Sequence, residues 1–324
     1  MEKIKVGVVG VGYLGQFHAE KYAKMENVEL VAVVDIDAPR AKEIAKRYRT
    51  EPFLHHSDLF NRVQAVSIAA PTPVHHTIAK DFLLHGIDVL LEKPISRTLA
   101  EADELVQLAE ANHLILQVGH LERFNGPLLA LEGRVQNPMF IEANRLGPFL
   151  MRGTDVDVVL DLMIHDIDII LSWVNSKVKW FHAVGIPVLT QRIDIANVRV
   201  EFENGCTANL TASRVSRERL RKIRLFQPNG YLSIDFLSQK VTFAGKKETL
   251  DKKGLPEIFV KKIPVKKVDP LKMEIQSFLQ CVRERKTPRV SGNDGRRALE
   301  LALQIVHGIE ELVASRVKRG RVAG

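Results

Sequence analysis

The first 120 residues of the chain alternate short apolar runs with longer segments whose apolar residues recur at helical spacing. The runs are brief and bounded by Gly, Pro or charge, which predicts strands at residues 4–9, 29–34, 65–70, 89–91 and 114–118. The intervening segments predict helices at 16–25, 39–47, 75–84 and 99–111. Strands that alternate with helices pair in parallel through crossover connections, so the pattern predicts an α/β fold with a doubly wound parallel sheet. Such a sheet binds ligands outside the carboxyl ends of its strands.

Beyond Gly119 the pattern changes to long strand-like segments. One helix is predicted at 156–174, and strands are predicted at 178–184, 196–203, 206–213, 222–227 and 231–235. Asn204-Gly205 and Asn229-Gly230 lie between such segments and predict hairpin turns, so the second sheet should be largely antiparallel. The Lys-rich stretch 245–268 fits an exposed edge or loop, and helices at 270–285 and 294–316 close the chain. We therefore expect a Rossmann domain at 1–120 and an α/β domain at 121–324, with the helices of 270–316 able to pack back on the first domain.

Composition narrows the class of protein. A length of 324 residues predicts about two domains. Cys206 and Cys281 are too few for a disulfide framework and are expected to be core thiols. The sequence has no apolar run near the ~20 residues that cross a bilayer, and its N-terminal stretch lacks a cleavage site, so we expect a soluble, cytoplasmic protein.

The net charge of +8 is unevenly distributed. Residues 1–120 carry 13 basic and 16 acidic side chains, and the remainder carries 34 and 23. The asymmetry indicates either a second domain that faces an anionic substrate or a solvated basic surface. The basic tail 316–321 has no interleaved aromatic residues, so no nucleic-acid partner is expected.

The sharpest motif is the glycine pattern Gly10-Val11-Gly12-Tyr13-Leu14-Gly15, which follows a predicted strand and precedes a predicted helix. Gly10 permits a tight turn, Gly12 lets the backbone approach a pyrophosphate, and Gly15 allows close packing of helix and strand. Asp35 ends the second predicted strand, where a carboxylate can accept from the ribose hydroxyls and would repel a 2′-phosphate. These residues predict a dinucleotide site that prefers NAD to NADP, although the nearby Arg40 blurs that preference. The alternative is a glycine turn without a ligand.

Two further strand ends carry chemistry-bearing residues. Ala70-Pro71-Thr72-Pro73 follows the third predicted strand and Glu92-Lys93-Pro94 the fourth. An ammonium at the end of an apolar strand could donate to a substrate hydroxyl or act with a shifted pKa. The alternative for Lys93 is a lysine that reaches water beside Glu92.

In the second part, Asp161 and His165 are four residues apart on a predicted helix and share one face, with Asp168 nearby. A carboxylate beside an imidazole orients the ring and stabilises the cation that forms when the ring accepts a proton. The pair is therefore a candidate general base, and a surface ion pair is the alternative. No metal site is expected, because His55-His56 and His75-His76 lack neighbouring ligands at metal spacing.

In this order and spacing, these motifs and the turn Thr72-Pro73-Val74-His75 resemble the glucose-fructose oxidoreductase, inositol dehydrogenase and rhizopine-catabolism (Gfo/Idh/MocA) family of NAD(P)-dependent oxidoreductases. The likeness spans nearly the whole chain and includes the closing helix at 294–298. It implies a second domain whose open sheet forms subunit contacts, hence a homodimer or homotetramer. It also implies that Lys93, Asp161 and His165 meet at the substrate. The cofactor residues from the motifs and the resemblance are Gly10, Gly12, Tyr13, Leu14, Gly15, Asp35, Ile36, Ala70, Pro71, Thr72, His75, Glu92, Lys93 and Arg123.

One branch of the family is more similar still. Gly119 to Asn125 and Asp161 to Asp166 look like the branch that acts on nucleotide-linked amino sugars, such as UDP-N-acetylglucosamine 3-dehydrogenases. A diphosphate needs cations, and the second domain offers Arg145, Arg152, Arg214, Arg217, Arg219 and Arg221, of which at least half are expected to face solvent. Residues 154–157 depart from the glycines that often precede this helix in relatives, which puts the substrate pocket in doubt.

The sequence therefore predicts an NAD-dependent dehydrogenase in which hydride passes between a sugar carbinol and the nicotinamide. His165 would take the hydroxyl proton, Asp161 would orient it, and Lys93 would fix the oxygen. Two alternatives remain: a non-catalytic regulator that binds dinucleotide or sugar, and a glycosidase that uses NAD transiently.

Overall fold

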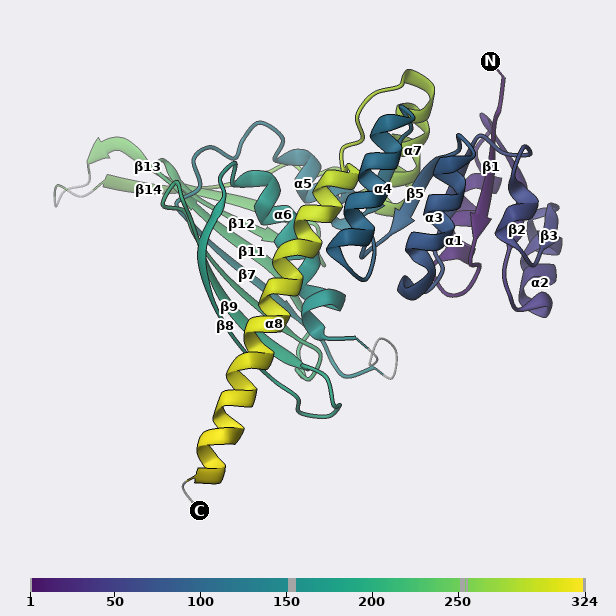
Figure 1. Ribbon diagram of the computed structural model, residues 1–324. Helices are drawn as coiled ribbons and strands as arrows, with labels where there is room; N and C mark the ends of the chain where they lie inside the picture. Colours follow the sequence, from purple (N-terminus) through teal and green to yellow (C-terminus); the bar gives the residue numbers. More distant parts are fainter. Residues whose placement is uncertain (1, 151–155, 251–253, 255, 323–324) are drawn as a thin grey trace. The chain divides into compact units, whose positions relative to one another are not determined.

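The computed structural model describes residues 2–150, 156–250, 254 and 256–322. The chain forms two compact units, here called unit 1 and unit 2. Unit 1 contains residues 1–124 and 269–299, and unit 2 contains residues 125–268 and 300–324. The C-terminal helix α8 (Gly292–Val322) begins in unit 1 and continues in unit 2. Figure 1 shows the elements in chain order.

Within its described residues, unit 1 is built on a six-stranded parallel sheet of order β3-β2-β1-β4-β5-β6. This is the order of a doubly wound dinucleotide-binding fold, with its switch point between β1 and β4. The strands are β1 (Ile4–Val9), β2 (Val28–Val34), β3 (Glu51–Phe53), β4 (Ala65–Ile68), β5 (Asp88–Glu92) and β6 (Leu116–Gly119).

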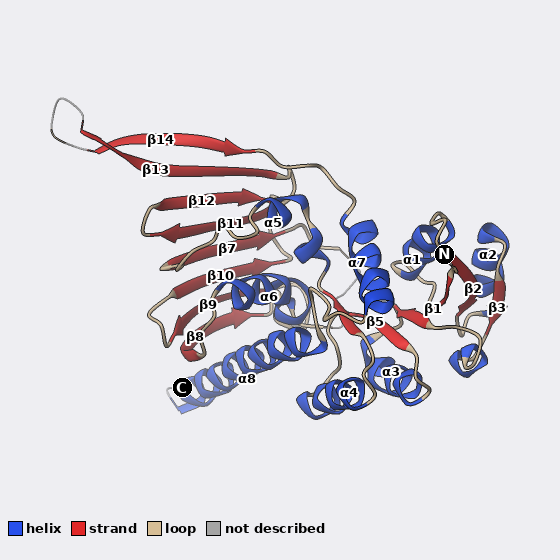
Figure 2. Cartoon of the chain, turned by 90° about the horizontal axis from the view of Figure 1, so that it is seen from above, coloured by secondary structure: helices blue, strands red, loops and turns tan. Residues whose placement is uncertain are grey.

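Helices cover both faces of this sheet, with α1 and α7 on one side and α3 and α4 on the other (Figure 2). Capping residues begin several of them: Asp37 caps α2, Thr98 and Glu101 form a capping box on α4, and Asp269 caps α7. The core under α1 and α7 contains Tyr22 and Phe278, both fully buried. The helical elements are α1 (Gly15–Ala23), α2 (Ala38–Tyr48), η1 (His56–Leu59), η2 (Thr72–Val74), α3 (His75–Leu84), α4 (Leu99–Ala111), η3 (Leu121–Phe124) and α7 (Pro270–Glu284).

Unit 2 has an eight-stranded sheet in its described part, of order β14-β13-β12-β11-β7-β10-β9-β8 (Figure 2). All neighbours are antiparallel except β7 and β10, which are parallel. The strands are β7 (Phe140–Leu146), β8 (Val178–Ile186), β9 (Ile195–Phe202), β10 (Thr207–Ser213), β11 (Leu220–Gln227), β12 (Gly230–Asp235), β13 (Lys240–Leu250) and β14 (Pro256–Ile263). The helical elements are α5 (Gly126–Ala130), η4 (Val159–Met163) and α6 (Ile164–Trp173).

The predicted α/β class is confirmed, with a parallel first sheet and a largely antiparallel second one. The sequence patterns missed β3, which is only three residues long, and β7, whose buried face includes the charged residue Arg145. The Lys-rich stretch forms the hairpin of β13 and β14 at one edge of the second sheet. Cys206 and Cys281 are both buried free thiols, as expected. Within the described residues, the structure has no helix with both the length and the apolar character to cross a membrane.

Candidate functional site

The glycine loop after β1 has the space that a pyrophosphate requires. Gly10 adopts φ +80°, and a Cβ there would come within 2.7 Å of the Ala70 backbone nitrogen. A Cβ at Gly15 would collide with the Gly10 carbonyl oxygen, whereas a Cβ at Gly12 would meet no atom within 4 Å. Gly10 and Gly15 are therefore required by packing, and Gly12 leaves an open cradle at the start of α1. This arrangement fits a dinucleotide phosphate group.

Three apolar residues around this cradle are exposed. Tyr13 is 58% exposed, Leu14 46% and Ile36 94%. Tyr13 also packs edge-on against the partly exposed ring of Phe17. Their exposure leaves these predicted cofactor residues accessible to a ligand.

Asp35 follows β2 and supports the glycine loop directly. Its Oδ2 accepts a hydrogen bond from the Val11 N–H at 2.8 Å, and its Oδ1 accepts one from the Asp37 N–H at 3.0 Å. Arg40 donates from Nε to the Val11 carbonyl oxygen and pairs with Glu43. Carboxylate oxygens have further lone pairs, so Asp35 can hold the loop and still accept from a ribose hydroxyl.

His75 joins the loops that follow β4 and β5. Its Nδ1 lies 2.9 Å from the Pro94 carbonyl oxygen and its Nε2 lies 2.8 Å from that of Ala70. Carbonyl oxygens only accept, so both hydrogen bonds form together only when both ring nitrogens are protonated. Burial lowers the pKa of His75, although the two carbonyl contacts and Glu92 oppose that effect. Because the residue is 1% exposed, it would affect a cofactor through the loops it holds.

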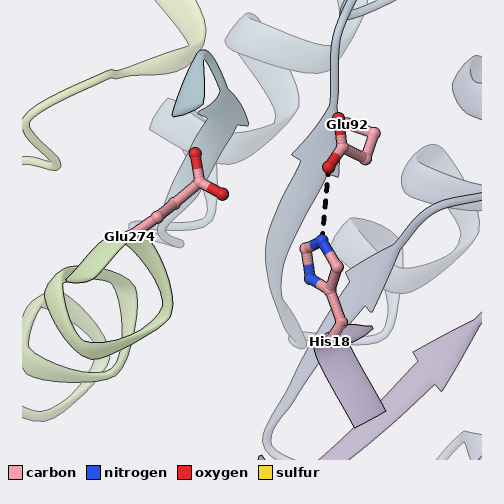
Figure 3. A group of neighbouring side chains, drawn as sticks. All are labelled: His18, Glu92 and Glu274. Atoms are coloured by element: carbon pink, nitrogen blue, oxygen red, sulfur yellow. Dashed lines mark hydrogen bonds and ion pairs between the residues drawn. The ribbon is translucent and has the colours of Figure 1, made fainter. Parts of the chain in front are cut away.

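Glu92 ends β5 and precedes Lys93. Its Oε1 pairs with His18 Nε2 at 3.2 Å (Figure 3), and its Oε2 accepts from the Lys93 backbone N–H at 3.3 Å. Burial alone would raise the pKa of Glu92, but the hydrogen bond and charge of His18 together with the charge of Lys93 hold it below its ordinary value. The carboxylate is therefore ionised at neutral pH and fixes the backbone at Lys93.

Two further residues of interest, His120 and Arg123, lie near the end of the first segment of unit 1. Arg123 donates to the Arg289 carbonyl oxygen at 3.1 Å, within unit 1. His120 is 1% exposed, and burial, reinforced by the charges of Lys93 and Arg123, lowers its pKa to about 3. His120 is therefore neutral at physiological pH.

Asp161 and His165 lie in unit 2, at the junction of two helix types. Asp161 lies within the π-helical turn η4, and His165 lies in the first turn of α6. The sequence pattern predicted one α-helix over this segment, and the π turn at its start is a departure from that prediction. Single π turns inside helices occur frequently at functional sites. Both side chains are half-buried.

Two buried ion pairs hold this segment. Arg145 on β7 makes a bidentate pair with Asp166 on α6, at 3.0 and 2.8 Å, with both side chains at most 4% exposed. Arg214 pairs with Asp194 at 2.9 Å and donates to the Val156 carbonyl oxygen at 2.6 Å. Three backbone N–H groups, those of Val188, Leu189 and Thr190, also donate to Asp194.

These pairs correct the prediction that Arg145 and Arg214 are available to bind a diphosphate. Arg145 and Arg214 are buried and engaged by carboxylates, so neither is available to a diphosphate. Arg217, Arg219 and Arg221 are exposed. Arg152 and residues 154–155 lie outside the described residues.

Hydrogen bonds at the carboxyl ends of its strands thus bring together, in unit 1, the glycine loop, Asp35, Ala70, His75 and Glu92. Lys93 belongs to unit 1, and Asp161 and His165 belong to unit 2. Their convergence on one substrate stays a prediction. The sequence patterns missed the pairing of His18 with Glu92 and the two ion pairs, because each joins residues that are at least 20 positions apart.

Comparison with protein families matches residues 4–120 to the model described as "Oxidoreductase family, NAD-binding Rossmann fold". Residues 125–233 match the GFO/IDH/MocA C-terminal domain.

Among curated proteins, the UDP-N-acetylglucosamine 3-dehydrogenase of Acidithiobacillus ferrooxidans is 36% identical over 311 residues, which cover 96% of this chain and 98% of the relative. A crystal form of that enzyme superposes with a TM-score of 0.90 over 96% of this chain and 99% of its own. An inositol 2-dehydrogenase of Rubrobacter xylanophilus is 32% identical over 195 residues, covering 57% of this chain and 56% of the relative.

Proposed function

The chain belongs to the Gfo/Idh/MocA family of oxidoreductases with an NAD-binding Rossmann fold, and from this premise we propose that it oxidises the 3-hydroxyl of a UDP-linked N-acetyl amino sugar. The observation that carries the substrate class is the 36% identity to a UDP-N-acetylglucosamine 3-dehydrogenase across 96% of the chain.

The cofactor site of this proposal rests on unit 1. NAD, when bound, supplies the hydride acceptor of the reaction. The open cradle at Gly12 lies just before the start of α1, and because a helix N-terminus favours an anion, we propose that the pyrophosphate binds there. Asp35 is proposed to accept from the ribose hydroxyls, and Arg40 has its charge partly balanced by Glu43, which supports NAD over NADP.

The proton chemistry rests on three side chains. In the oxidation direction, His165 accepts the proton of the sugar hydroxyl, and Asp161 orients the imidazole and stabilises its cationic form. Lys93 donates a hydrogen bond to the substrate oxygen and stabilises the negative charge that develops on it. The Glu92 carboxylate fixes the Lys93 backbone, and the Arg145–Asp166 pair holds the helix that carries His165.

The assembly of the enzyme is a separate part of the proposal. Phe140, Phe226 and Tyr231 form a row of ring contacts across β7, β11 and β12. They alternate with the side chains that face α6, such as Arg145, so they lie on the other face of the sheet. We propose that a homodimer or homotetramer of a cytoplasmic enzyme forms through this face.

The test is to incubate the protein with NAD and UDP-N-acetylglucosamine and follow NADH absorbance, with UDP-glucose, free N-acetylglucosamine and NADP as comparison substrates. The proposal expects NADH with the UDP-linked amino sugar and much slower turnover with the others. Sugar release without NADH would show a glycosidase, and tight binding without either product would show a regulator. Either result would overturn the proposal.

A further inference from the structure

Helix α7 places a carboxyl group inside the core of unit 1. Glu274 is fully buried among Ile275, Phe278 and Leu279 of the same helix. Its backbone carbonyl oxygen accepts from the Gln117 side chain at 3.2 Å, but its carboxyl oxygens have no hydrogen-bond partner among the described residues. Burying a polar group without a partner destabilises a fold, so a buried acid in this position is expected to have a role.

The acid faces the ion pair beside the candidate lysine. Atoms of His18, Glu92 and Glu274 lie within 4.8 Å of one another, although the residues come from α1, β5 and α7. In Figure 3 the carboxyl group of Glu274 is turned toward the His18–Glu92 pair. The cluster contains two carboxyl groups and one imidazole, so ionising both acids would bury unbalanced negative charge.

The surroundings of Glu92 and Glu274 shift the pKa values of the two acids in opposite directions. Glu92 receives hydrogen bonds from His18 and from the Lys93 N–H, and its pKa is held below its ordinary value despite burial. Glu274 receives no such hydrogen bond from the residues that the structure describes, and burial, followed by the charge of Glu92, raises its pKa well above the ordinary value. Neighbouring environments that drive two pKa values apart assign one group as the base and the other as the acid.

A neutral carboxyl group still needs partners for its O–H and its carbonyl oxygen. One water that makes two hydrogen bonds of about 2.8 Å at a tetrahedral angle bridges two atoms about 4.6 Å apart. The side-chain atoms of this cluster lie within 4.8 Å of one another, so one such water fits between them. The Gln117 Oε1 atom is also buried, has no hydrogen-bond partner within the described part of the chain, and adds a further acceptor. Other titratable groups also face the cluster. Tyr22 is hydrogen-bonded to Ser67, the charges of His75 and Lys93 act on Glu92, and the charge of Glu92 acts on the buried His120.

We propose that Glu274 is a positioning residue: a neutral carboxylic acid that donates through one bound water to Glu92 and so keeps the Glu92 carboxylate on the backbone N–H of Lys93. The inference rests on the proposed function only in that Lys93 is the residue positioned. It assigns a role to an acid that the proposed chemistry does not use.

The test compares Glu274→Gln, which keeps a neutral donor and acceptor, with Glu274→Leu, which keeps only the bulk. The infrared difference between wild type and Glu274→Gln at neutral pH should show the carbonyl band of a protonated carboxylic acid. Hydrogen exchange of the Lys93 amide should be unchanged in Glu274→Gln and about tenfold faster in Glu274→Leu, as expected for one weakened hydrogen bond. In the kinetic assay, Glu274→Leu should lose about tenfold in kcat with little change in KM, and Glu274→Gln should retain most of it.

The infrared and hydrogen-exchange measurements do not require turnover. If the wild-type protein formed no NADH, that result would therefore count against the proposed function alone. Absence of the band, or equal Lys93 exchange in both variants and wild type, would overturn the inference. Stoichiometric zinc or manganese in the purified protein that Glu274→Gln removes would also overturn it, because the cluster would then be a metal site.

Discussion

The two units hold their candidate functional residues by different means. In unit 1 the contacts of Asp35 and His75 go to the backbone, since Asp35 accepts from the Val11 N–H and His75 lies between the carbonyl oxygens of Ala70 and Pro94. Glu92 is the exception, because it also pairs with the side chain of His18. In unit 2 the contacts are buried ion pairs between side chains, Arg145 with Asp166 and Arg214 with Asp194.

The difference predicts how each region responds to substitution. A loop that is fixed by hydrogen bonds to its backbone should keep its conformation when one side chain is replaced. Substitutions in unit 1 should therefore change ligand preference more than they change the free energy of unfolding. Removing one partner of a buried ion pair leaves an uncompensated charge, so substitutions in unit 2 should alter folding strongly.

The largest expected effect is the loss of kcat when the candidate base in unit 2 is replaced. His165→Ala should lower kcat by about 10² to 10⁴-fold, because a general base contributes on that scale. NAD affinity, measured by calorimetry, should stay nearly unchanged, since the proposed cofactor residues belong to unit 1. His182→Ala, an exposed histidine of β8, is the control. Full turnover by His165→Ala would exclude His165 as the base.

The next effect is on the stability of unit 2. Asp166→Asn should lower the free energy of unfolding by about 3–5 kcal/mol, because it leaves the Arg145 guanidinium buried without its carboxylate. Urea denaturation measures the change. The exposed pair Lys179–Glu201 provides the control, and Glu201→Gln should lower the free energy of unfolding far less than Asp166→Asn does. Equal losses in both variants would show that burial does not set the contribution of these pairs.

A smaller effect concerns cofactor preference in unit 1. Asp35→Ala should weaken NAD binding by about tenfold, the effect of one lost charge-assisted hydrogen bond, and should reduce the preference over NADP. Calorimetric titration with both dinucleotides measures this. Asp37→Ala removes a helix cap two residues away and should leave the preference intact. If both variants bind the dinucleotides like wild type, Asp35 makes no ribose contact.

The smallest effect is a pH dependence of unit 1. Folding lowers the pKa of His120 from its ordinary 6.5 to about 3, so the unfolded chain binds more protons between these values. Stability should therefore fall as the pH drops through this window, by about 1 kcal/mol between pH 6 and pH 5. Thermal melts of wild type and His120→Gln over this range provide the measurement. If the melting temperature of His120→Gln fell with pH as steeply as that of wild type, His120 would not be the source of the pH dependence.

The same contrast explains how much of the structure was predictable from the sequence. The strands of unit 1 other than β3 were predicted because each is a short apolar run bounded by Gly, Pro or charge, and β1 was placed at its observed bounds. β7 was missed because its buried residues, Ile141, Ala143 and Arg145, include an arginine, so apolar and polar residues do not alternate cleanly along the strand. Its parallel pairing with β10 depends on contacts between segments far apart in the sequence.

For the site, local motifs predicted the glycine loop and a carboxylate, Asp35, at the end of β2, but not the hydrogen bond from the Val11 N–H to that carboxylate. They could not show that Arg145 and Arg214 are buried, because an arginine's burial depends on a carboxylate supplied by another element. Glu274 was missed for the same reason: it lies on the buried face of an amphipathic helix, and only the fold brings it to Glu92.

The central claim is that an ammonium from unit 1 and an imidazole from unit 2 act on one substrate hydroxyl. A double-mutant cycle in the rate of NADH formation tests it most directly, with Lys93→Met, His165→Asn and the combined variant. The account predicts that the combined variant is little slower than the slower single variant, because both residues serve one transition state. Losses that multiply would mean that the two side chains act independently, which would contradict it.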